Sequence, residues 1–117
     1  MIEVRAYLKR LDTSPKKVRL ILGLVRGLKA STAEERLTFA NKRAALPVLK
    51  LLRSAMANAT HNHQLRRDSL RIKEIRADEG PMENRWRPRA HGRAFPIRQR
   101  SSRVTIVLTG ESEEKQA

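Results

Sequence analysis

The stretch from Arg85 to Arg103 constrains this chain more than any other feature. It contains seven arginines and no acidic residue, and Pro88, Gly92 and Pro96 interrupt its few apolar side chains. Such a segment cannot build a hydrophobic core of its own, and its composition alone would equally allow a disordered basic loop. The flanking sequence favours an ordered segment, because both flanks carry the alternating pattern of a strand.

Alternation of apolar and polar residues, with a period of two, indicates a half-buried strand. Two series of apolar residues show this alternation. One lies after the stretch (Val104, Ile106 and Leu108), and one lies before it (Leu70, Ile72, Ile75 and Ala77). The second series shifts its phase by one, which predicts a β-bulge near Lys73-Glu74. The simplest connection is an antiparallel hairpin, whose arms of about 15 residues would reach on the order of 50 Å. A compact body of this length has a radius of gyration of only about 13 Å, so we expect the hairpin to project from it.

The first part of the chain predicts one strand followed by helices. Alternation over residues 2–9 indicates the strand, and Ser14-Pro15 indicates an N-cap followed by proline in the first helical position. We expect this first helix to end at Gly27. Ser31 and Thr32 are each followed three residues later by glutamate, which predicts a capping box at the start of a second, short helix.

The third predicted helix is the longest. We expect it to end near His63, with Pro47 either delaying its start or kinking its first turns. Its predicted apolar face consists of Ala45, Val48, Leu49, Leu52, Met56 and Ala59. The length of 117 residues favours one domain, expected over residues 1–110 with a hairpin extension over about 78–103. An acidic, frayed tail is expected over residues 111–117.

The charge of the chain indicates a polyanionic partner. Its 26 Lys and Arg residues oppose 12 Asp and Glu, which gives a formal net charge of +14. A compact domain this basic repels itself, and phosphate groups usually relieve that repulsion. The absence of cysteine excludes disulfides, thiolate metal sites and cysteine nucleophiles. No apolar run approaches the ~18 residues of a membrane span, and we expect neither a signal peptide nor contact with a membrane.

Two segments carry the predicted nucleic-acid contacts. Residues 14–19 place three cations in the first turns of a helix, where the helix dipole disfavours them unless an anion occupies that end. The alternative is that these side chains extend into water. The arginine-rich stretch interleaves arginine with rings that stack on unpaired bases, as folded RNA requires. The candidate residues are Ser14, Lys16, Lys17, Arg19, Arg85, Trp86, Arg87, Arg89, His91, Arg93, Arg98, Arg100 and Arg103.

Other chemistry finds little support in the sequence. His61-Asn62-His63 has no cysteine or nearby carboxylate to complete a metal site, and contact with carbonyls or with a backbone phosphate suits these histidines better. Asp78-Glu79 would point to opposite faces of a strand and could not share a substrate atom. We therefore expect no catalysis, no metal and no cofactor.

Four motifs in order resemble one known family. They are Ser14-Pro15-Lys16-Lys17-Val18-Arg19, then Ser54-Ala55-Met56-Ala57-Asn58-Ala59 with His61-Asn62-His63, then Asp78-Glu79-Gly80-Pro81, then Arg87-Pro88-Arg89-Ala90-His91-Gly92-Arg93-Ala94. From about Val4 to Leu108 the chain resembles the bacterial-type large-subunit ribosomal protein family numbered twenty-two. The resemblance implies an α+β fold, with a three-stranded antiparallel sheet packed on three helices and a long protruding β-hairpin.

The resemblance also implies a function. A member of this family is a structural constituent of the large ribosomal subunit, binds 23S-type rRNA and helps assembly. Its body lies near the peptide exit, and its hairpin tip lines the nascent-peptide tunnel beside large-subunit protein number four. Carried over by residue, Arg85 and residues 87–94 fall on the tip and returning arm, and residues 14–19 on the RNA-facing helix start. The expected location is the cytoplasmic ribosome, with an organelle-encoded ribosome as the alternative.

Two other functions fit the basic composition. A DNA-compacting protein would need a helix with basic and polar residues facing a groove, whereas the third helix is mostly alanine and leucine, with Lys50 and Arg53 sparse. A peptide-interaction module would use the edges of the hairpin. RNA binding accounts for more of the sequence than either.

Overall fold

The computed structural model describes residues 2–40, 42–80, 83–88, 94–99 and 101–112. Strands and helices follow one another along the chain as β1 (Ile2–Leu11), α1 (Pro15–Gly23), α2 (Ala30–Phe39), α3 (Ala45–His61), the 3₁₀ turn η1 (Arg67–Ser69), β2 (Arg71–Glu79), β3 (Glu83–Pro88), β4 (Ala94–Gln99) and β5 (Ser102–Gly110).

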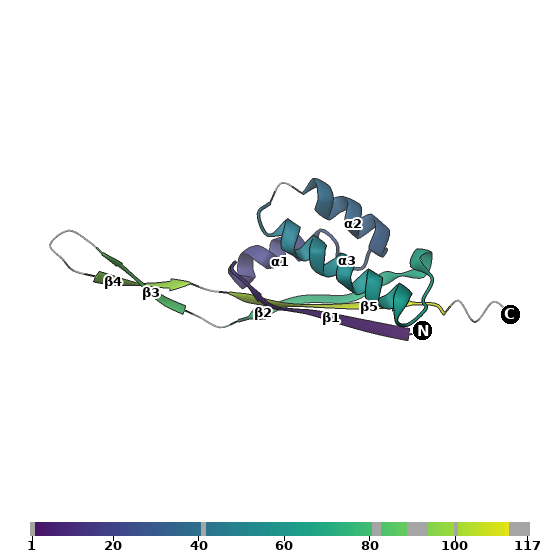
Figure 1. Ribbon diagram of the computed structural model, residues 1–117. Helices are drawn as coiled ribbons and strands as arrows, with labels where there is room; N and C mark the ends of the chain where they lie inside the picture. The colour runs from purple at the N-terminus through teal and green to yellow at the C-terminus, as the bar shows by residue number, and fades with distance from the viewer. Residues whose placement is uncertain (1, 41, 81–82, 89–93, 100, 113–117) are drawn as a thin grey trace.

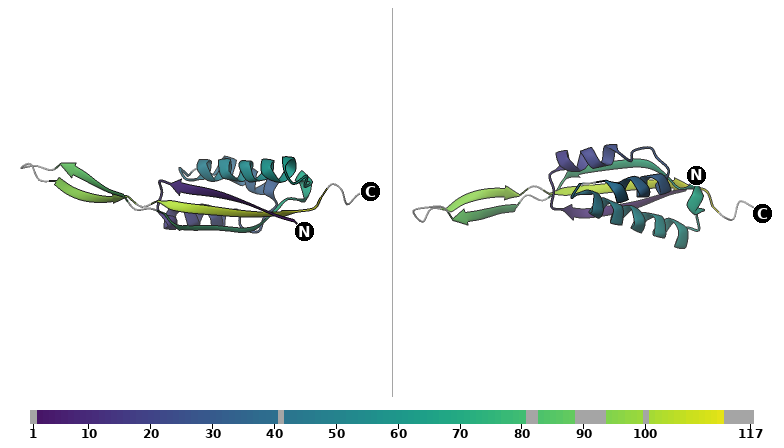
Figure 2. Two further views of the ribbon diagram at one scale, coloured as in Figure 1. Left: turned by 60° about the horizontal axis from the view of Figure 1, so that its bottom comes forward. Right: turned by 90° about the horizontal axis from the view of Figure 1, so that it is seen from above.

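Strands β1, β5 and β2 form one antiparallel sheet in that order, with β5 in the centre. Helices α1 and α3 pack against one face of this sheet, and α2 packs on α3 (Figures 1 and 2). None of the described helices covers the opposite face, which lies below the sheet in Figure 1. The predicted α+β fold, with a three-stranded antiparallel sheet and three helices, is therefore confirmed.

The core lies between the sheet and α3. All six residues of the predicted apolar face of α3 are buried, and Val104, Ile106 and Leu108 of β5 meet them from the sheet. Full burial of one such aliphatic side chain contributes about 1.5–3 kcal/mol. The central strand therefore holds both edge strands and the helices in one hydrophobic unit.

The bulge in β2 is confirmed. The pairing of β2 with β5 shifts its register between Ile72 and Glu74, so that one residue is unpaired at Lys73. Because the side-chain period of a strand is two, this extra residue returns Ile75 and Ala77 to the buried face.

The predicted end of the first helix is wrong by four residues. Helix α1 ends at Gly23, and the N–H groups of Leu24 and Val25 donate to the carbonyls three residues earlier, Ile21 and Leu22. This tighter turn keeps Val25 in the core, which is why the apolar spacing continues past the helix. Gly27 lies in the following turn with φ of +78°.

The predicted capping box is also wrong. Helix α2 begins at Ala30, one residue before Ser31, and its N-cap is Lys29, with no side-chain capping bond. The N–H of Ala30 instead donates to the carbonyl of Leu70, which precedes β2, at 3.0 Å. A backbone partner from elsewhere in the fold thus replaces the predicted side-chain cap.

Helix α3 resolves the position of Pro47. The helix begins at Ala45, so the proline lies in its first turn, where its missing N–H has no intrahelical partner to lose. The helix ends at His61, two residues before the predicted end, with Asn62 as its C-cap.

Strands β3 and β4 pair with each other in a separate antiparallel sheet, here called the arm. In Figures 1 and 2 the arm extends beyond the end of the main sheet, away from the helices. The molecule measures 75 × 24 × 17 Å, and its radius of gyration of 17.8 Å exceeds the value of about 13 Å for a compact chain of this length. The connection between β3 and β4, residues 89–93, lies outside the described residues.

The first residues of the predicted tail are bound to the body. Glu111 accepts a hydrogen bond from Arg66 Nη2 at 2.6 Å, and the N–H of Arg66 donates to the Glu111 carbonyl at 2.9 Å. Ser112 forms a β-bridge with Leu65. Residues 113–117 lie outside the described part of the chain.

Candidate nucleic-acid interface

The fold brings the start of α1 next to the base of the arm. Ser102 Oγ, at the start of β5, donates to the carbonyl of Thr13 at 2.6 Å, directly before the N-cap of α1. On the other side of the base, the N–H of Gly80 donates to the carbonyl of Ser101 at 2.9 Å. The sequence singled out these two segments, whose nearest candidate residues, Arg19 and Arg85, are 66 positions apart. The fold brings the two segments into one region.

The start of α1 carries uncompensated positive charge. Ser14 is the N-cap, but its hydroxyl forms no capping bond, and no acidic residue lies in the first turn. Lys16 and Lys17 are both exposed. Pro15 has no N–H, and the N–H of Lys17 donates to the carbonyl of Ser14 at 3.1 Å. The N–H of Lys16, the helix dipole and two neighbouring ammonium groups make this end suitable for a phosphate.

Arg19 has a structural partner that the sequence did not reveal. Its Nε and Nη2 donate to the carbonyl of Ala77 on β2 at 3.3 and 3.1 Å. Arg26, in the turn that follows α1, donates from Nη2 to the carbonyl of Ile75 at 3.1 Å. Both guanidinium groups thus bind the segment that contains α1 to strand β2.

The arm carries the other predicted residues. Arg85, Trp86 and Arg87 lie in β3, and Arg98 lies in β4 opposite Asn84. Arg103 is exposed on β5, where it pairs in register with Asp78. Four predicted residues, Arg89, His91, Arg93 and Arg100, lie outside the described residues.

The sequence missed a groove along the free edge of β1. Val4 is buried, and Ala6 and Leu8 pack against the core, whereas the alternate residues Arg5, Tyr7 and Lys9 are exposed along this edge. This groove, here called the edge groove, has a volume of about 660 Å³. It is lined by Arg5, Ala6, Tyr7 and Lys9 of β1, by Leu51, Ser54, Ala57, Asn58 and His61 of α3, and by Asn62. No sequence signal could reveal it, because it exists only where β1 lies beside α3.

Glu3, at the start of β1, is engaged by a lysine from the other edge of the sheet. Lys73, the bulge residue, donates to the Glu3 carboxylate. This hydrogen bond, together with the positive charge of Lys73, lowers the pKa of Glu3 below its ordinary value.

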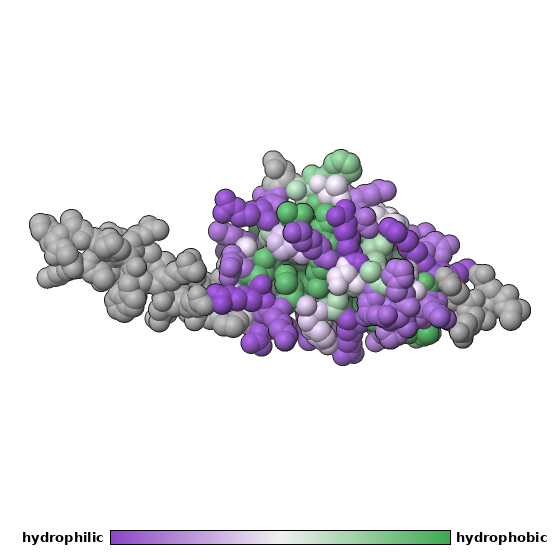
Figure 3. Space-filling model, in the orientation of Figure 1, coloured by the Kyte–Doolittle hydropathy of each residue, from purple (hydrophilic) through white to green (hydrophobic). Residues whose placement is uncertain are grey.

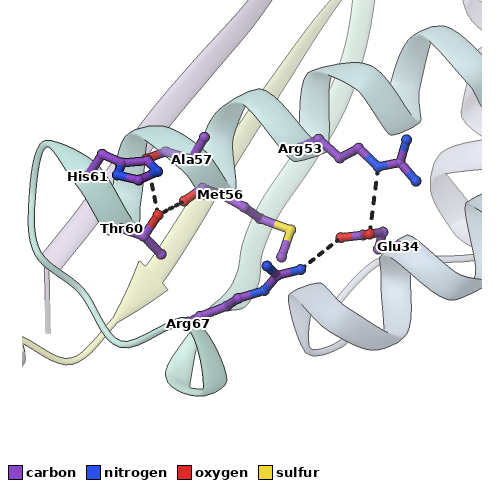
Figure 4. Close-up of a pocket in the computed structure, with 7 residues that line it drawn as sticks. All are labelled: Glu34, Arg53, Met56, Ala57, Thr60, His61 and Arg67. Carbon is purple, nitrogen blue, oxygen red and sulfur yellow. Dashed lines mark hydrogen bonds and ion pairs between the residues drawn. The ribbon is translucent and has the colours of Figure 1, made fainter.

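A second pocket, between α2, α3 and η1, contains cations that already have a partner (Figure 4). Arg53 and Arg67 both face Glu34, each with a nitrogen 3.6 Å from one carboxylate oxygen. The pocket encloses about 270 Å³. Its arginines hold α2 against α3 and η1, and the carboxylate between them disfavours an incoming anion.

The side of the body turned toward the viewer in Figure 3 is apolar in its middle. Figure 3 shows hydrophobic residues gathered there, with hydrophilic residues around them. The exposed large apolar residues include Leu20 and Leu24 of α1 and Phe39 of α2, which is 84% exposed.

His61 and His63 bring no further ligands together. The described part of the chain contains no group of three or more His, Asp or Glu side chains placed to hold a metal ion. None of the described helices combines the length and the apolar character needed to cross a bilayer.

Comparison with known proteins identifies the family. The sequence pattern of the family described as "Ribosomal protein L22p/L17e" matches residues 6–109. The chain belongs to this family. Large ribosomal subunit protein uL22 of Mesoplasma florum is 46% identical over 110 residues, which cover 94% of this chain and 98% of that protein. Its counterpart in Staphylococcus aureus strain JH9 is 44% identical over 117 residues, covering 99% and 100%.

Family membership confirms the resemblance found in the sequence. A chain of this family is a structural constituent of the large ribosomal subunit and not an enzyme. The predicted location in the ribosome of the cytoplasm agrees with this assignment.

Proposed function

We propose that this chain binds large-subunit rRNA through the start of α1 and through the arm, and that these contacts help the subunit assemble. The observation that carries the proposal is the position of the arginine-rich stretch. Its described part forms a two-stranded sheet separate from the core sheet. Arginine neutralises phosphates, and the resulting release of counterions gives an affinity that falls steeply with salt.

The body supplies a second set of contacts beside the arm. Lys16, Lys17 and Arg103 are exposed around the base where the arm joins the sheet. Arg19 contributes there too, since its guanidinium has donors beyond the two that bind Ala77. An rRNA strand lying against the arm would meet these cations at its base.

Removal of the arm tests the proposal. The hydrogen bond from Gly80 to Ser101 marks the place where a two-residue Asn-Gly turn can replace residues 81–100 without disturbing β2 or β5. We expect the shortened protein to bind an rRNA transcript much more weakly and with a smaller salt slope. An unchanged affinity and slope would contradict the proposal.

A charge variant separates electrostatics from shape. Replacing the six arm arginines by glutamine should reduce the slope of log affinity against log salt by up to about four, since each phosphate contact contributes roughly 0.7. The residues are Arg85, Arg87, Arg89, Arg93, Arg98 and Arg100. Replacing the same six by lysine retains the charge and should preserve most of the slope.

We further propose that residues 87–94 lie at the wall of the nascent-peptide tunnel, near large-subunit protein number four. This chain contains no cysteine, so one introduced thiol is unique within it and can be placed at a chosen position. His91→Cys in reconstituted subunits should crosslink to a stalled nascent peptide, and His63→Cys on the body should not. Equal crosslinking from both positions, or none from residue 91, would contradict this placement.

A further inference from the structure

We propose that the edge groove between β1 and α3 binds a single-stranded segment of RNA, as a contact separate from the arm. This proposal rests on the proposed function, because it assumes that the chain binds rRNA. It assigns a role to Arg5, Lys9, Ser54 and Asn58, which are distant from the arginine-rich stretch in sequence.

Charge distinguishes the edge groove from the other described cavities. Each of those is lined by Glu34, by Glu35 or by both. The described residues that line the edge groove include no Asp or Glu, and they include Arg5, Lys9 and His61. The nearest acidic residue in sequence, Glu3, is engaged by Lys73. The groove is therefore complementary to an anionic chain.

The α3 wall of the groove carries a row of polar side chains beside the apolar Leu51 and Ala57. Ser54, Asn58 and His61 follow one another at helical spacing, so they lie along one face of α3. The Asn62 side-chain amide donates to Asn58 Oδ1 at 2.6 Å, which leaves the amide group of Asn58 to donate outward. Together with the Ser54 hydroxyl, it can bind phosphate oxygens and the ribose 2′-hydroxyl.

The β1 wall adds the remaining elements of single-strand recognition. Arg5 and Lys9 are both exposed and both line the groove. The charge of Arg5 also contributes, less than Lys73 does, to the lowered pKa of Glu3. Tyr7 lies between them and is 61% exposed, which leaves its ring accessible for stacking on a base. Cations spaced along an aromatic residue are the usual arrangement in sites for unpaired RNA.

A peptide that pairs with β1 as an added strand is the alternative occupant, because β1 is an edge strand. Arg5, Lys9 and Arg10 oppose that occupant, since charged side chains on an edge strand disfavour pairing with a further strand. The observations therefore favour RNA.

The first test removes positive charge from the β1 wall. Arg5→Gln combined with Lys9→Gln should weaken binding to a large-subunit rRNA transcript on the order of tenfold and reduce the salt slope by about 1.4, at roughly 0.7 per contact. The matched control is Lys42→Gln combined with Arg43→Gln. This pair also removes two exposed cations, but neither residue lines the groove. The control should retain the wild-type slope.

The second test adds negative charge without changing volume. Asn58→Asp keeps the oxygen that accepts from Asn62 and places a carboxylate on the α3 wall. It should weaken binding severalfold, whereas Gln64→Glu, an exposed change outside the groove, should have little effect. Circular dichroism of each variant verifies that the fold is retained.

The arm-shortened protein is measured in the same titration, which separates the two proposals. If the groove variants bind like the wild type while loss of the arm weakens binding, the groove proposal is wrong and the proposed function stands. If the wild type itself shows no salt-dependent binding to the transcript, the proposed function fails, and the groove proposal fails with it. Weakened binding of both groove variants, with unchanged controls, supports the groove.

Discussion

Some arginines of this chain hold the fold together, and others are free to bind RNA in the proposed function. The hydrogen bonds of single residues distinguish the two groups. Arg19 and Arg26 donate to carbonyls of β2 and so hold the α1 segment against the sheet. Lys16, one turn before Arg19, is exposed and has no such bond. Sequence reasoning grouped Arg19 with Lys16 because both follow the same N-cap. Only the tertiary structure shows that one of them also stabilises the fold.

Replacement of Arg19 by methionine should therefore affect stability as well as binding. The change removes two donors from the carbonyl of Ala77, so we expect the free energy of unfolding to fall by about 1 kcal/mol. Lys16→Met, which removes an exposed charge only, should leave that free energy nearly unchanged. Urea titrations of both variants measure the difference. Equal stability of the two would show that the Arg19 bonds contribute nothing.

The Glu3–Lys73 pair predicts a pH effect of defined sign. Because the pKa of Glu3 is lowered in the folded protein, its stabilising contribution is present above the pKa of the unfolded chain and is lost as pH falls through the folded value. Lys73→Gln should raise the pKa of Glu3 toward its ordinary value, as followed by NMR titration of the carboxyl carbon. Lys9→Gln serves as the control and should not move it. A Glu3 pKa that is the same in the Lys73 variant as in the wild type would refute the assignment.

At the scale of elements, the junction between the main sheet and the arm restricts which side chain fits at position 80. A Cβ added at Gly80 would lie 2.6 Å from Ser101 Oγ, 3.2 Å from the carbonyl carbon of Ser101 and 3.3 Å from the amide nitrogen of Ser102. The closest atom is the hydroxyl oxygen of Ser101, a buried residue, and the two backbone atoms lie just inside ordinary contact distance. This is a reason for glycine where β2 ends, independent of any turn conformation.

We expect Gly80→Ala to destabilise the protein by about 1–3 kcal/mol, because the buried Ser101 hydroxyl must move and the neighbouring backbone must adjust to admit the methyl group. Gly23→Ala provides the matched control, since a Cβ there meets nothing within 4 Å. That change should be neutral or stabilising by about 0.4–1 kcal/mol. Thermal unfolding of both variants measures the contrast, and similar melting temperatures would contradict the steric argument.

Periodicity predicted the elements better than their ends. The apolar face of α3 and the bulge at Lys73 followed from local patterns, since each depends on which residues a helix or strand turns toward the core. The end of α1 and the start of α2 could not be predicted from local patterns. The first depends on a tight turn that keeps Val25 buried, and the second on the carbonyl of Leu70, 40 residues away in sequence. The edge groove was missed for the same reason, because it requires β1 and α3 together.

At the scale of the whole molecule, the arm and the body differ in how they are stabilised. Strand β5 is paired with β1 on one side and β2 on the other, and its apolar residues are buried in one cluster with those of α3. Strands β3 and β4 pair only with each other, as a two-stranded sheet. A two-stranded sheet alone is marginally stable in water. The difference predicts a gradient of stability along the long axis.

Amide hydrogen exchange of the free protein should reveal this gradient. We expect the paired amides of β3 and β4 to exchange several orders of magnitude faster than those of Ile106 and Leu108 in β5. Binding to the rRNA transcript should slow exchange in β3 and β4 selectively. If these strands were as well protected as β5 in the free protein, the arm would be stable without RNA.

The central place of β5 has a mechanical consequence. The chain that returns from the arm enters the middle strand of the sheet, which is bonded to a neighbour along each side. Hydrogen bonds of antiparallel strands run perpendicular to the strand axis. Tension applied to the arm along that axis therefore loads both ladders in shear, with many bonds resisting together. The body should therefore resist forces that pull on the arm along its length.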